Sequence, residues 1–336
     1  MSQTKLITFS KQELRYNTRY LRDVILPQVI QGGFNYLSGH SINRLSEFLQ
    51  KLEVSKVTVH MLSYSRIHNA LEEICNSHRH WSLEIVKNAQ HILSEWEENL
   101  GPLSLIQSNL WEPGGRMEGC CKTSTEKYDG ANAEKEEGQL ARHRSSSRWI
   151  VKSADPTNAY VFGHNGFQVG QWWIKQAAAF RDGIIDNSTN DITHDSINAY
   201  AIVLKGTLNE IDDKGGGTIY YHSSNKTKGV FRVMHNLVNR RSVRILRTSK
   251  LGSKFAPACG VRYDGLYRIS GHSVKLRCHE NQDEDNMEYV FELKREPGQP
   301  SMKEAMRHPM SDELDDWKEY QAINAKGKGW VCSLAK

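Results

Sequence analysis

One stretch of the chain carries far more positive charge than its surroundings. Between Lys226 and Arg277 there are thirteen lysines and arginines but one acid, Asp264, which gives these 52 residues a net charge of +12. A group of acids with no base among them comes directly after it: Glu280, Asp283, Glu284, Asp285 and Glu288. The whole chain of 336 residues has a net charge of only +5, so the positive charge is concentrated. A block this basic, in a sequence that otherwise looks folded, is typical of a surface that contacts phosphate groups. The alternative is a solvated basic face.

The sequence lacks the residue patterns of the common enzymes and metal sites. Its six cysteines include no CxxC pair, and Cys75, His78 and His80 have no fourth ligand at metal spacing. Residues 292–294 form a Glu-Leu-Lys triplet of a kind found in nucleases, but they fall on an expected strand and no His-Asn-His cluster accompanies them. Residues 215–217, three glycines, predict a hairpin turn, and no P-loop, GxSxG or methyltransferase motif is present. We therefore expect no catalytic residue, no metal and no cofactor.

Four stripes of apolar residues at helical spacing occupy the first hundred residues. They comprise Leu14, Leu21 and Ile25; Ile42, Leu45, Phe48, Leu49 and Leu52; Leu62, Ile67, Leu71 and Ile74; and Leu83, Val86, Ala89, Ile92, Leu93 and Trp96. Pro27 is expected to end the first helix or to cap the segment after it, and Gly101-Pro102 to stop the last helix. Four amphipathic helices joined by short turns predict a small helical bundle over residues 1–110.

The composition changes after the bundle. Residues 111–150 are rich in Gly, Ser, Lys and Glu, which predicts a flexible linker. From Trp149 onward, short β-rich runs alternate with glycine-containing turns. The clearest expected strands are residues 199–204, 218–221, 242–247, 266–269 and 289–293. The predicted fold class is α+β: the bundle, the linker, a twisted β-barrel flanked by helices over residues 151–300, and a polar C-terminal extension over 301–336 with a short helix at 312–322.

Three segments of the second half, in order, resemble the SRA/YDG (SAD/SRA) family of DNA-binding domains. They are Val161-Phe162-Gly163-His164 with Val169-Gly170-Gln171-Trp172-Trp173; Gly183-Ile184 with Asn198–Leu204; and Lys254–Ala258 with Arg262-Tyr263-Asp264-Gly265-Leu266-Tyr267. A Tyr-Asp-Gly triplet alone is unspecific, because another one lies at residues 128–130. The ordered set over about 140 residues carries the resemblance. We expect the triplet at 263–265 to be a structural turn whose glycine permits a positive φ.

The resemblance implies a crescent-shaped β-barrel that grips a DNA duplex and flips one modified cytosine into a pocket. Flipping costs a few kcal/mol, which the pocket has to return. An aromatic ring returns ~1–3 kcal/mol by stacking on the base. A carboxylate or a carbonyl oxygen accepts from the cytosine amino group.

By the same resemblance, particular residues take the places of the pocket. Tyr220 takes the stacking position, and Tyr221 stands where the family usually has a hydroxyl residue. The alternative is that both tyrosines pack on the core. The pocket acid is Glu210 or Asp212, since a shift of one residue in the alignment decides between them. A second ring often precedes these acids in the family, but this chain has Gly206 and Leu208 there, so a grip by two rings is not expected.

Two loops resemble those that fill the space left by the flipped base. One lies near Arg181, and the other begins at Asn225-Lys226. The segment from Lys226 to Ser242 is shorter than in readers of hemimethylated DNA, so selectivity for hemimethylated over fully methylated sites is not predicted. Further expected phosphate contacts are Lys228, Arg240, Arg241, Lys254 and Arg262. Arg244 alternates with the apolar Val243 and Ile245, so we expect it to face away from the core.

The bundle resembles the N-terminal domain of transcription elongation factor S-II. The resemblance rests on four segments: Leu45–Leu52, Val57–Val59, Ser65–Leu71 and Ala89–Trp96. It implies a module that binds a short disordered peptide of a nuclear protein. The alternative is a generic bundle that braces the second domain.

Together these expectations describe a nuclear, non-catalytic reader of methylated cytosine in double-stranded DNA, whose bundle recruits a nuclear protein peptide. No membrane partner is expected, because the sequence has no run of eighteen apolar residues. Two alternatives stay open. One is a modification-dependent endonuclease. The other is a chromatin adaptor with a degenerate pocket that binds DNA nonspecifically.

Overall fold

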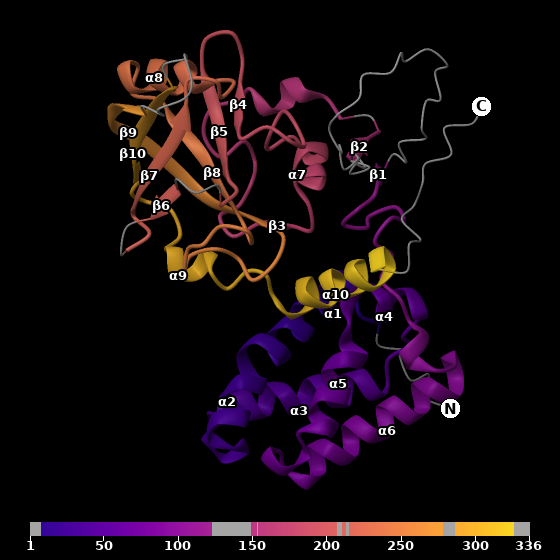
Figure 1. Cartoon of the computed structure of the whole chain (residues 1–336). Coiled ribbons are helices and arrows are strands. Elements are labelled where there is room, and N and C mark those ends of the chain that lie inside the picture. The colour runs from indigo at the N-terminus through magenta and orange to yellow at the C-terminus, as the bar shows by residue number, and fades with distance from the viewer. Residues whose placement is uncertain are drawn as a thin grey trace, which may run out of the picture. The chain divides into compact units, whose positions relative to one another are not determined.

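The chain divides into two compact units in the computed structural model (Figure 1). The structure describes residues 8–122, 149–152, 154–206, 210–212, 215–277 and 286–325. The first unit comprises Met1–Gly115 and Met310–Glu319, and the second comprises Arg116–Pro309 and Tyr320–Lys336. Helices build the first unit and a large sheet dominates the second, which confirms the α+β class.

The first unit is a bundle of short helices. Its elements are α1 (Lys11–Arg19), the π-helical turn η1 (Tyr20–Ile25), α2 (Leu26–Gly32), η2 (Phe34–Tyr36), α3 (Gly39–Glu53), α4 (Val59–Ser65), α5 (Ile67–Asn76), η3 (His78–His80), α6 (Leu83–Leu100) and η4 (Leu103–Leu105). Helices α1, α3, α4 and α6 begin at a hydroxyl side chain that accepts a hydrogen bond from a backbone N–H in the first turn: Ser10, Ser38, Thr58 and Ser82. The predicted apolar stripes meet in one core, to which all four contribute buried residues.

One boundary of the bundle differs from the expected one, and another decides between two alternatives. The third stripe is divided into α4 and α5, because Arg66 has a φ of 59° and so leaves the right-handed helical conformation. Of the two alternatives for Pro27, the second is confirmed: it does not end the first helix but starts the next one. It lies in the first turn of α2, directly after η1, where its missing N–H has little consequence.

The second unit contains the sheet and the short elements around it. Its strands are β1 (Cys120–Lys122), β2 (Trp149–Val151), β3 (Trp172–Trp173), β4 (Ile192–His194), β5 (Ala199–Leu204), β6 (Glu210–Asp212), β7 (Thr218–Ser224), β8 (Ser242–Thr248), β9 (Val261–Arg277) and β10 (Asn286–Arg295). Its helices are η5 (Pro156–Ala159), α7 (Gln176–Asp182), α8 (Val230–Val238) and α9 (Met302–Ala305). Helix α10 (Ser311–Ala325) begins in the first unit and ends in the second.

The main sheet has the strand order β4-β5-β8-β9-β10-β7-β6, with β3 paired to β9. Its neighbours are antiparallel except for β5 and β8, which are parallel. Among the strands that the structure describes, the two ends of this order, β4 and β6, do not pair, so the sheet is open. The expected twisted β-barrel is therefore corrected to an open sheet, within the α+β class that was predicted. Helix α8 lies against the sheet, where Val230 and Val233 join its core (Figure 1).

Three arginines of the basic block lie in the interior of the second unit: Arg244, Arg247 and Arg262. The expectation that Arg244 faces away from the core is wrong. Every residue of β8 after Ser242 is buried. Both faces of the strand are therefore covered, and residues on neither face are exposed. Arg244 donates to carbonyl oxygens of Ala159, Val161, Gly163 and Ile184, and burial lowers its pKa to about 10. It thereby anchors the segments that precede β3 and follow α7.

The Tyr-Asp-Gly triplet is structural, but it is not a turn. Residues 263–265 lie within β9, opposite an irregularity between Ile245 and Leu246 of β8. Gly265 has a φ of 107°, and a Cβ there would overlap the side-chain oxygen of Gln299. The glycine therefore permits a bulge and a close approach in the middle of a long strand.

In the described part of the chain, no helix combines the length and the apolar character that a bilayer crossing requires.

Candidate nucleic-acid interface

Strand β7 separates the two tyrosines that the sequence placed in a base pocket. Tyr220 is 41% exposed, whereas Tyr221 is 2% exposed. Their side chains point to opposite faces because neighbouring residues of a strand alternate. The ring of Tyr221 stacks against Phe291 with centroids 6.4 Å apart, so it belongs to the core and cannot contact a base. Of this pair, Tyr220 alone offers its ring to a ligand.

A carboxylate that the sequence suggested only as part of a nuclease triplet lies beside Tyr220. Glu292 of β10 is the direct cross-strand partner of Tyr220, so both side chains leave the same face of the sheet. Its Oε2 accepts a hydrogen bond from the hydroxyl of Ser270 over 2.6 Å, and the ammonium of Lys294 lies 3.3 Å from Oε1. These contacts lower the pKa of Glu292, the Ser270 hydrogen bond most. A fixed hydrogen-bond acceptor therefore accompanies the exposed ring.

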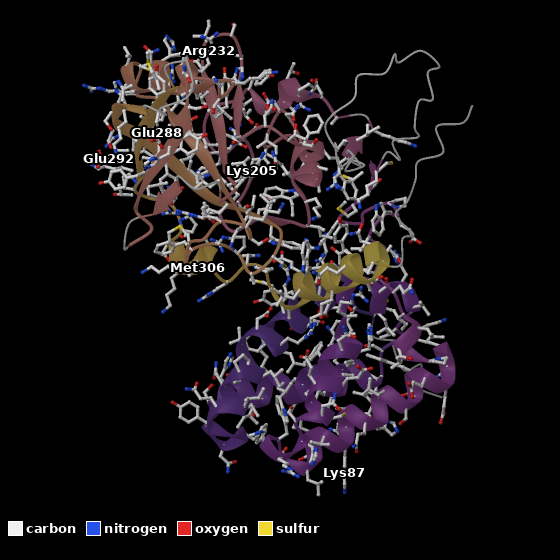
Figure 2. The ribbon with its side chains drawn as sticks, in the orientation of Figure 1. Lys87, Lys205, Arg232, Glu288, Glu292 and Met306 are labelled. Atoms are coloured by element: carbon white, nitrogen blue, oxygen red, sulfur yellow. The ribbon has the colours of Figure 1, made fainter. Side chains whose placement is uncertain are left out.

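A second polar pair lies further along the same two strands. The imidazole Nδ1 of His222 lies 2.9 Å from Oε1 of Glu288, and both side chains are largely buried. His222 follows Tyr220 by two residues, so the two side chains share a face of β7. Figure 2 labels Glu288 and Glu292 on β10. The pair extends the polar character of the surface next to Tyr220.

The remaining predicted pocket residues lie on or beside β6. Glu210 pairs in register with Tyr221, and Asp212 with Ile219. Leu208 lies outside the described residues. Gly206 follows β5 with a φ of 77°, and a Cβ on it would overlap the carbonyl oxygen of Lys250. Gly206 thus lets the chain pass close to the loop that follows β8.

Exposed cations lie at both ends of α8. Lys226 and Lys228 precede the helix, and Arg240 and Arg241 follow it. Nine residues of α-helix span roughly 14 Å, so two positive patches are held at that separation. Asn225 is half-buried, and its backbone N–H donates to the carbonyl oxygen of Met287 over 3.0 Å, which ties the first patch to β10.

An aromatic side chain near the first patch was not predicted from the sequence. Phe231 in the first turn of α8 is 53% exposed and meets the ring of Tyr289 edge-on, with centroids 5.8 Å apart. Lys228 and Arg232 flank it in the sequence. An exposed ring among cations is suited to contact a base or a sugar. The helical periodicity of residues 230–238 could have indicated that Phe231 lies off the buried stripe.

The other residues predicted to contact phosphate differ in how far their side chains are exposed to solvent. Lys254 is exposed, with its ammonium 5.0 Å from the ring centroid of Phe255. Arg181 is only partly exposed, since its Nη1 donates to the backbone oxygens of Arg116 and Glu118 and its Nε to Asp182.

Arg262 is 1% exposed and donates to both oxygens of Asp264 and to the carbonyl oxygens of Phe255 and His308. Arg262 is therefore a core residue, and its predicted DNA contact is wrong. The sequence does not reveal that Arg262 is buried. The carboxylate that neutralises it, Asp264, is recognised as its partner only in the structure.

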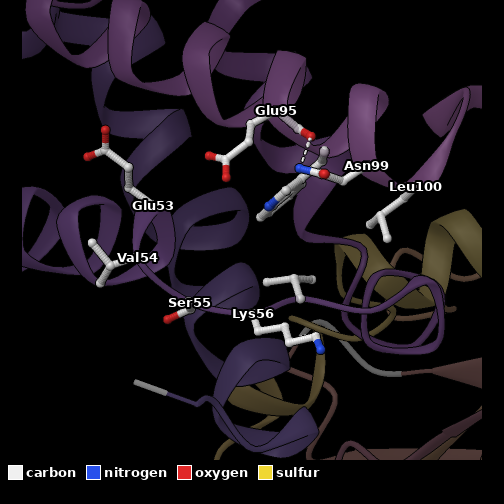
Figure 3. Close-up of a pocket in the computed structure, with 9 residues that line it drawn as sticks. Glu53, Val54, Ser55, Lys56, Glu95, Asn99 and Leu100 are labelled. Carbon is white, nitrogen blue, oxygen red and sulfur yellow. Dashed lines mark hydrogen bonds between the residues drawn. The ribbon is translucent and has the colours of Figure 1, made fainter. Parts of the chain in front are cut away.

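The first unit contains a hollow of about 550 Å³ between the end of α3, residues 54–57 and α6 (Figure 3). Trp96, Val57 and Leu100 form its apolar part, and the rim carries Glu53, Lys56, Glu95 and Asn99. The amide of Asn99 donates to the backbone oxygen of Glu95 over 2.8 Å, which fixes one side of the rim (Figure 3). The hollow is large enough for one apolar side chain of a peptide, with charged groups of both signs around it.

Within the described residues, no three histidine, cysteine or acidic side chains come together as a metal site.

Comparison with known proteins identifies a family match within the second unit. Residues 161–299 match the family model of the SAD/SRA domain. A UHRF1-like protein of Cryptococcus neoformans var. grubii is 29% identical over an alignment of 138 residues, and the match covers 33% of this chain and 40% of the relative. The chain thus covers less than half the length of that curated relative.

Two solved structures are similar to part of this chain. The SUVH5 SRA domain in complex with hemimethylated CG DNA is 21% identical, covers 42% of this chain and 97% of its own, and has a TM-score of 0.34. The modification-dependent TagI restriction endonuclease is 21% identical, covers 40% of this chain and 52% of its own, and has a TM-score of 0.34.

Proposed function

Because residues 161–299 form an SAD/SRA domain, we propose that the chain is a non-catalytic reader of methylated cytosine in double-stranded DNA. The observation that carries the proposal is the exposed ring of Tyr220 beside the fixed carboxylate of Glu292. A flipped cytosine needs a stacking surface for its face and an acceptor for its amino group. The surface around β7 and β10 offers both.

Phosphate contacts would come from the exposed cations of the same unit. These cations are Lys226 and Lys228 before α8, Arg240 and Arg241 after it, and Lys254, all of which are exposed. These contacts supply affinity for any duplex and weaken as salt rises, because they release counterions from the DNA. Preference for a modified base has to come from the pocket.

The pocket of this chain predicts a modest preference. One ring returns ~1–3 kcal/mol by stacking, which is comparable to the few kcal/mol that flipping costs. The acceptor for the cytosine amino group is Glu210, Asp212 or Glu292. Glu292 is favoured by its register with Tyr220, and the other two by the family resemblance.

The remaining parts of the proposal concern the cellular setting. A reader of methylated DNA acts on chromatin, so we place the protein in the nucleus. The bundle would recruit a peptide of a nuclear protein, and the hollow between α3 and α6 supports this role because it can take an apolar anchor. Arg181 would brace residues 116–118 and contact DNA only through its exposed edge.

The test is binding of the full chain to four matched duplexes that are unmodified, hemimethylated, fully methylated or hydroxymethylated. We expect a preference of about tenfold, or about 1.4 kcal/mol, for one modified duplex. Tyr220→Ala should remove this preference and leave affinity for the unmodified duplex unchanged. Tyr36→Ala, which removes an exposed ring from the first unit, should leave both unchanged.

Two results would overturn the proposal. Equal and steeply salt-dependent binding to all four duplexes would identify a nonspecific DNA-binding platform with a degenerate pocket. Cleavage of a methylated duplex after addition of Mg²⁺ would instead identify a modification-dependent nuclease.

A further inference from the structure

The C-terminal part of the first unit docks on the bundle through its acids. In the segment Met310–Glu319, the fully buried side chains of α10 are Asp312, Glu313 and Asp316, at 1%, 3% and 7% exposure. Its large apolar residues, Leu314 and Trp317, are only half-buried. An amphipathic helix ordinarily buries its apolar stripe and exposes its charges. In residues 310–319 the most deeply buried side chains are instead acids, so charge contributes more than apolar burial to the docking of this segment.

Four arginines of the bundle receive these acids, and we call them the arginine face: Arg15 and Arg19 of α1, Arg22 of η1, and Arg66 between α4 and α5. Arg15, Arg19 and Arg22 follow one another at intervals of four and three residues, so they lie on one side of the helical path. The arginine face is thus a row of guanidinium groups with helical spacing.

The carboxylates of α10 match this row in order. Arg15 and Arg19 both pair with Asp312, the second with 2.6 Å between Nε and Oδ1. Arg22 lies 2.5 Å from Asp315, measured from Nη1 to Oδ2. At the other end, Arg66 Nη2 lies 2.6 Å from Glu319 Oε2, and both Glu319 oxygens accept from the backbone N–H of Ser108 over 2.7 Å.

Polar groups beneath the arginine face are left unsatisfied. His68 of α5 is 3% exposed, and its Nδ1 has no hydrogen-bond partner within the described residues. The Nε atom of Arg66 is also buried and has no hydrogen-bond partner within the described residues. Arg22, by contrast, also pairs with Glu73 of α5. The resident helix therefore fits the arginine face well in charge but leaves hydrogen-bonding capacity beneath it unused.

Energetics make such a helix replaceable. Buried ion pairs gain little net stability, because the cost of taking two charges out of water offsets their attraction. A helix held mainly by such pairs is bound only weakly, and the positions of its charges determine where it binds. Another helix with acids at the same spacing would make the same contacts.

We propose that the arginine face is the docking site for an acidic helix of a partner protein, and that residues 310–319 occupy it as an internal competitor. The partner has to present carboxylates at positions equivalent to Asp312, Asp315, Asp316 and Glu319. This site is separate from the hollow of Figure 3, which lies on α3 and α6. The proposal does not depend on the reading of DNA by the second unit.

The test uses the full chain and a labelled peptide of its own residues 308–322 as the probe, with binding followed by fluorescence anisotropy. In the variant Asp312→Asn/Asp315→Asn/Asp316→Asn the internal helix loses three charges and keeps its size. We expect this variant to bind the peptide about tenfold or more tightly than the unmodified chain, whose site is occupied. Adding Arg19→Gln and Arg22→Gln to the variant should abolish the gain.

A control variant removes three charges elsewhere. Glu84→Gln/Glu97→Gln/Glu98→Gln neutralises three exposed acids of α6 that do not line the hollow, and should bind the peptide as the unmodified chain does. If the α10 variant is folded by circular dichroism and gains no peptide binding, the proposal is wrong. The proposal would also be overturned if the α10 variant bound an unmodified DNA duplex more tightly than the unmodified chain does but bound the peptide no more tightly. The arginine face would then be a phosphate-binding surface.

A second measurement needs no substitution in the protein and covers the case in which the α10 variant does not fold. Hydrogen exchange of residues 311–319 is followed at about 0.1 M and about 1 M NaCl, over which the Debye length falls from about 10 Å to about 3 Å. We expect exchange in α10 to accelerate with salt and with added peptide, while α3 and α6 stay protected. Exchange in α10 that is as slow as in α6 under all conditions would mean a permanent structural helix and would overturn the proposal.

Discussion

Asp264 accepts a hydrogen bond from Nε of Arg262 over 2.6 Å in the interior of the second unit, where the two side chains are 0% and 1% exposed. Arg247 donates to the same carboxylate from the neighbouring strand β8. One acid thus balances two arginines within the sheet. A buried ion pair of this kind adds little net stability, but removal of one partner leaves the other charge buried without compensation.

Asp264→Asn should therefore destabilise the second unit by about 3–5 kcal/mol. The free energy of opening, from hydrogen exchange of the β9 amides, measures this effect without assuming that both units unfold together. Asp191→Asn is the matched control, since Asp191 pairs with Lys205 at partly exposed positions and should cost less than about 1 kcal/mol. Equal effects of the two substitutions would contradict the structural role assigned to Asp264.

Local sequence patterns predicted the elements of this protein better than their connections. The apolar run of Ala199–Leu204 and the alternation at Ser242–Arg247 gave correct strands, because a strand is a local pattern. Closure of the sheet depends on whether β4 meets β6, and no local pattern encodes that pairing. The turn expected at Tyr263–Gly265 proved to be a bulge inside β9, because its conformation depends on β8.

The basic block shows that the number of charged residues in a segment does not predict which of them are exposed. Its thirteen cations predict a phosphate-binding surface, yet Arg244, Arg247 and Arg262 are internal. The rule that alternating positions face solvent assumes that one side of the strand is open, and both sides of β8 are covered. The exposure of Tyr220 and the burial of Tyr221 follow from alternation, whereas Glu292 reaches Tyr220 only through the register of β10. That register cannot be read from either strand alone.

Substitutions of the two tyrosines of β7 should affect different properties: Tyr221 the stability of the second unit and Tyr220 the binding of DNA. Tyr221→Ala removes a core ring that stacks on Phe291 and should cost about 3–5 kcal/mol of unfolding free energy, as for other buried aromatic truncations. Tyr220→Ala, at an exposed position, should change it by less than about 0.5 kcal/mol. Hydrogen exchange of the β7 and β10 amides measures both. A large loss of stability from Tyr220→Ala would show that its ring is part of the core.

The exposed cations around α8 should appear in the salt dependence of DNA binding. Lys228→Ala or Arg240→Ala should weaken binding to modified and unmodified duplexes alike and should reduce the slope of log K against log salt by about 0.9 for each lost contact. Lys205→Ala is the control, because the ammonium of Lys205 is already bonded to Asp191 and to the carbonyl oxygen of Asn190. An unchanged slope in the first two variants would remove the ends of α8 from the interface.

The stability of the first unit should fall in mild acid because of His68. Burial lowers the pKa of His68 from 6.5 to about 4, and the nearby charge of Arg66 adds to this effect. Below pH 6.5 the unfolded chain takes up a proton that the folded chain refuses, so this contribution is complete above pH 6.5 and is lost as the pH falls toward 4. The loss amounts to about 3 kcal/mol.

Urea unfolding of His68→Phe, followed by circular dichroism over this pH range, tests the assignment. The variant should lose the His68 part of the pH dependence, while His80→Gln, at an exposed position of η3, should keep it. The acids of the unit titrate in both proteins, so the difference between their curves isolates His68. Parallel curves for His68→Phe and the unmodified chain would show that folding does not lower the pKa of His68.

Gly206 provides a test of how the segment after β5 is positioned. A Cβ at this residue would overlap the carbonyl oxygen of Lys250 and lie 2.8 Å from the Cα of Leu251, and the φ of 77° adds strain for any other residue. Gly206→Ala should therefore cost about 2 kcal/mol, measured by hydrogen exchange of the β5 amides. Gly252→Ala, in the loop that follows β8 and with open space around it, should change stability by less than about 0.5 kcal/mol.

The same pair of variants has a consequence for binding. The chain runs from Gly206 to the predicted pocket acids Glu210 and Asp212, so moving this segment should reduce preference for a modified duplex. Affinity for the unmodified duplex should persist, since the cations around α8 lie on a different part of the chain. If Gly206→Ala keeps the full preference while β5 is destabilised, the acids of β6 do not form the pocket, and Glu292 beside Tyr220 becomes the acceptor for the cytosine amino group.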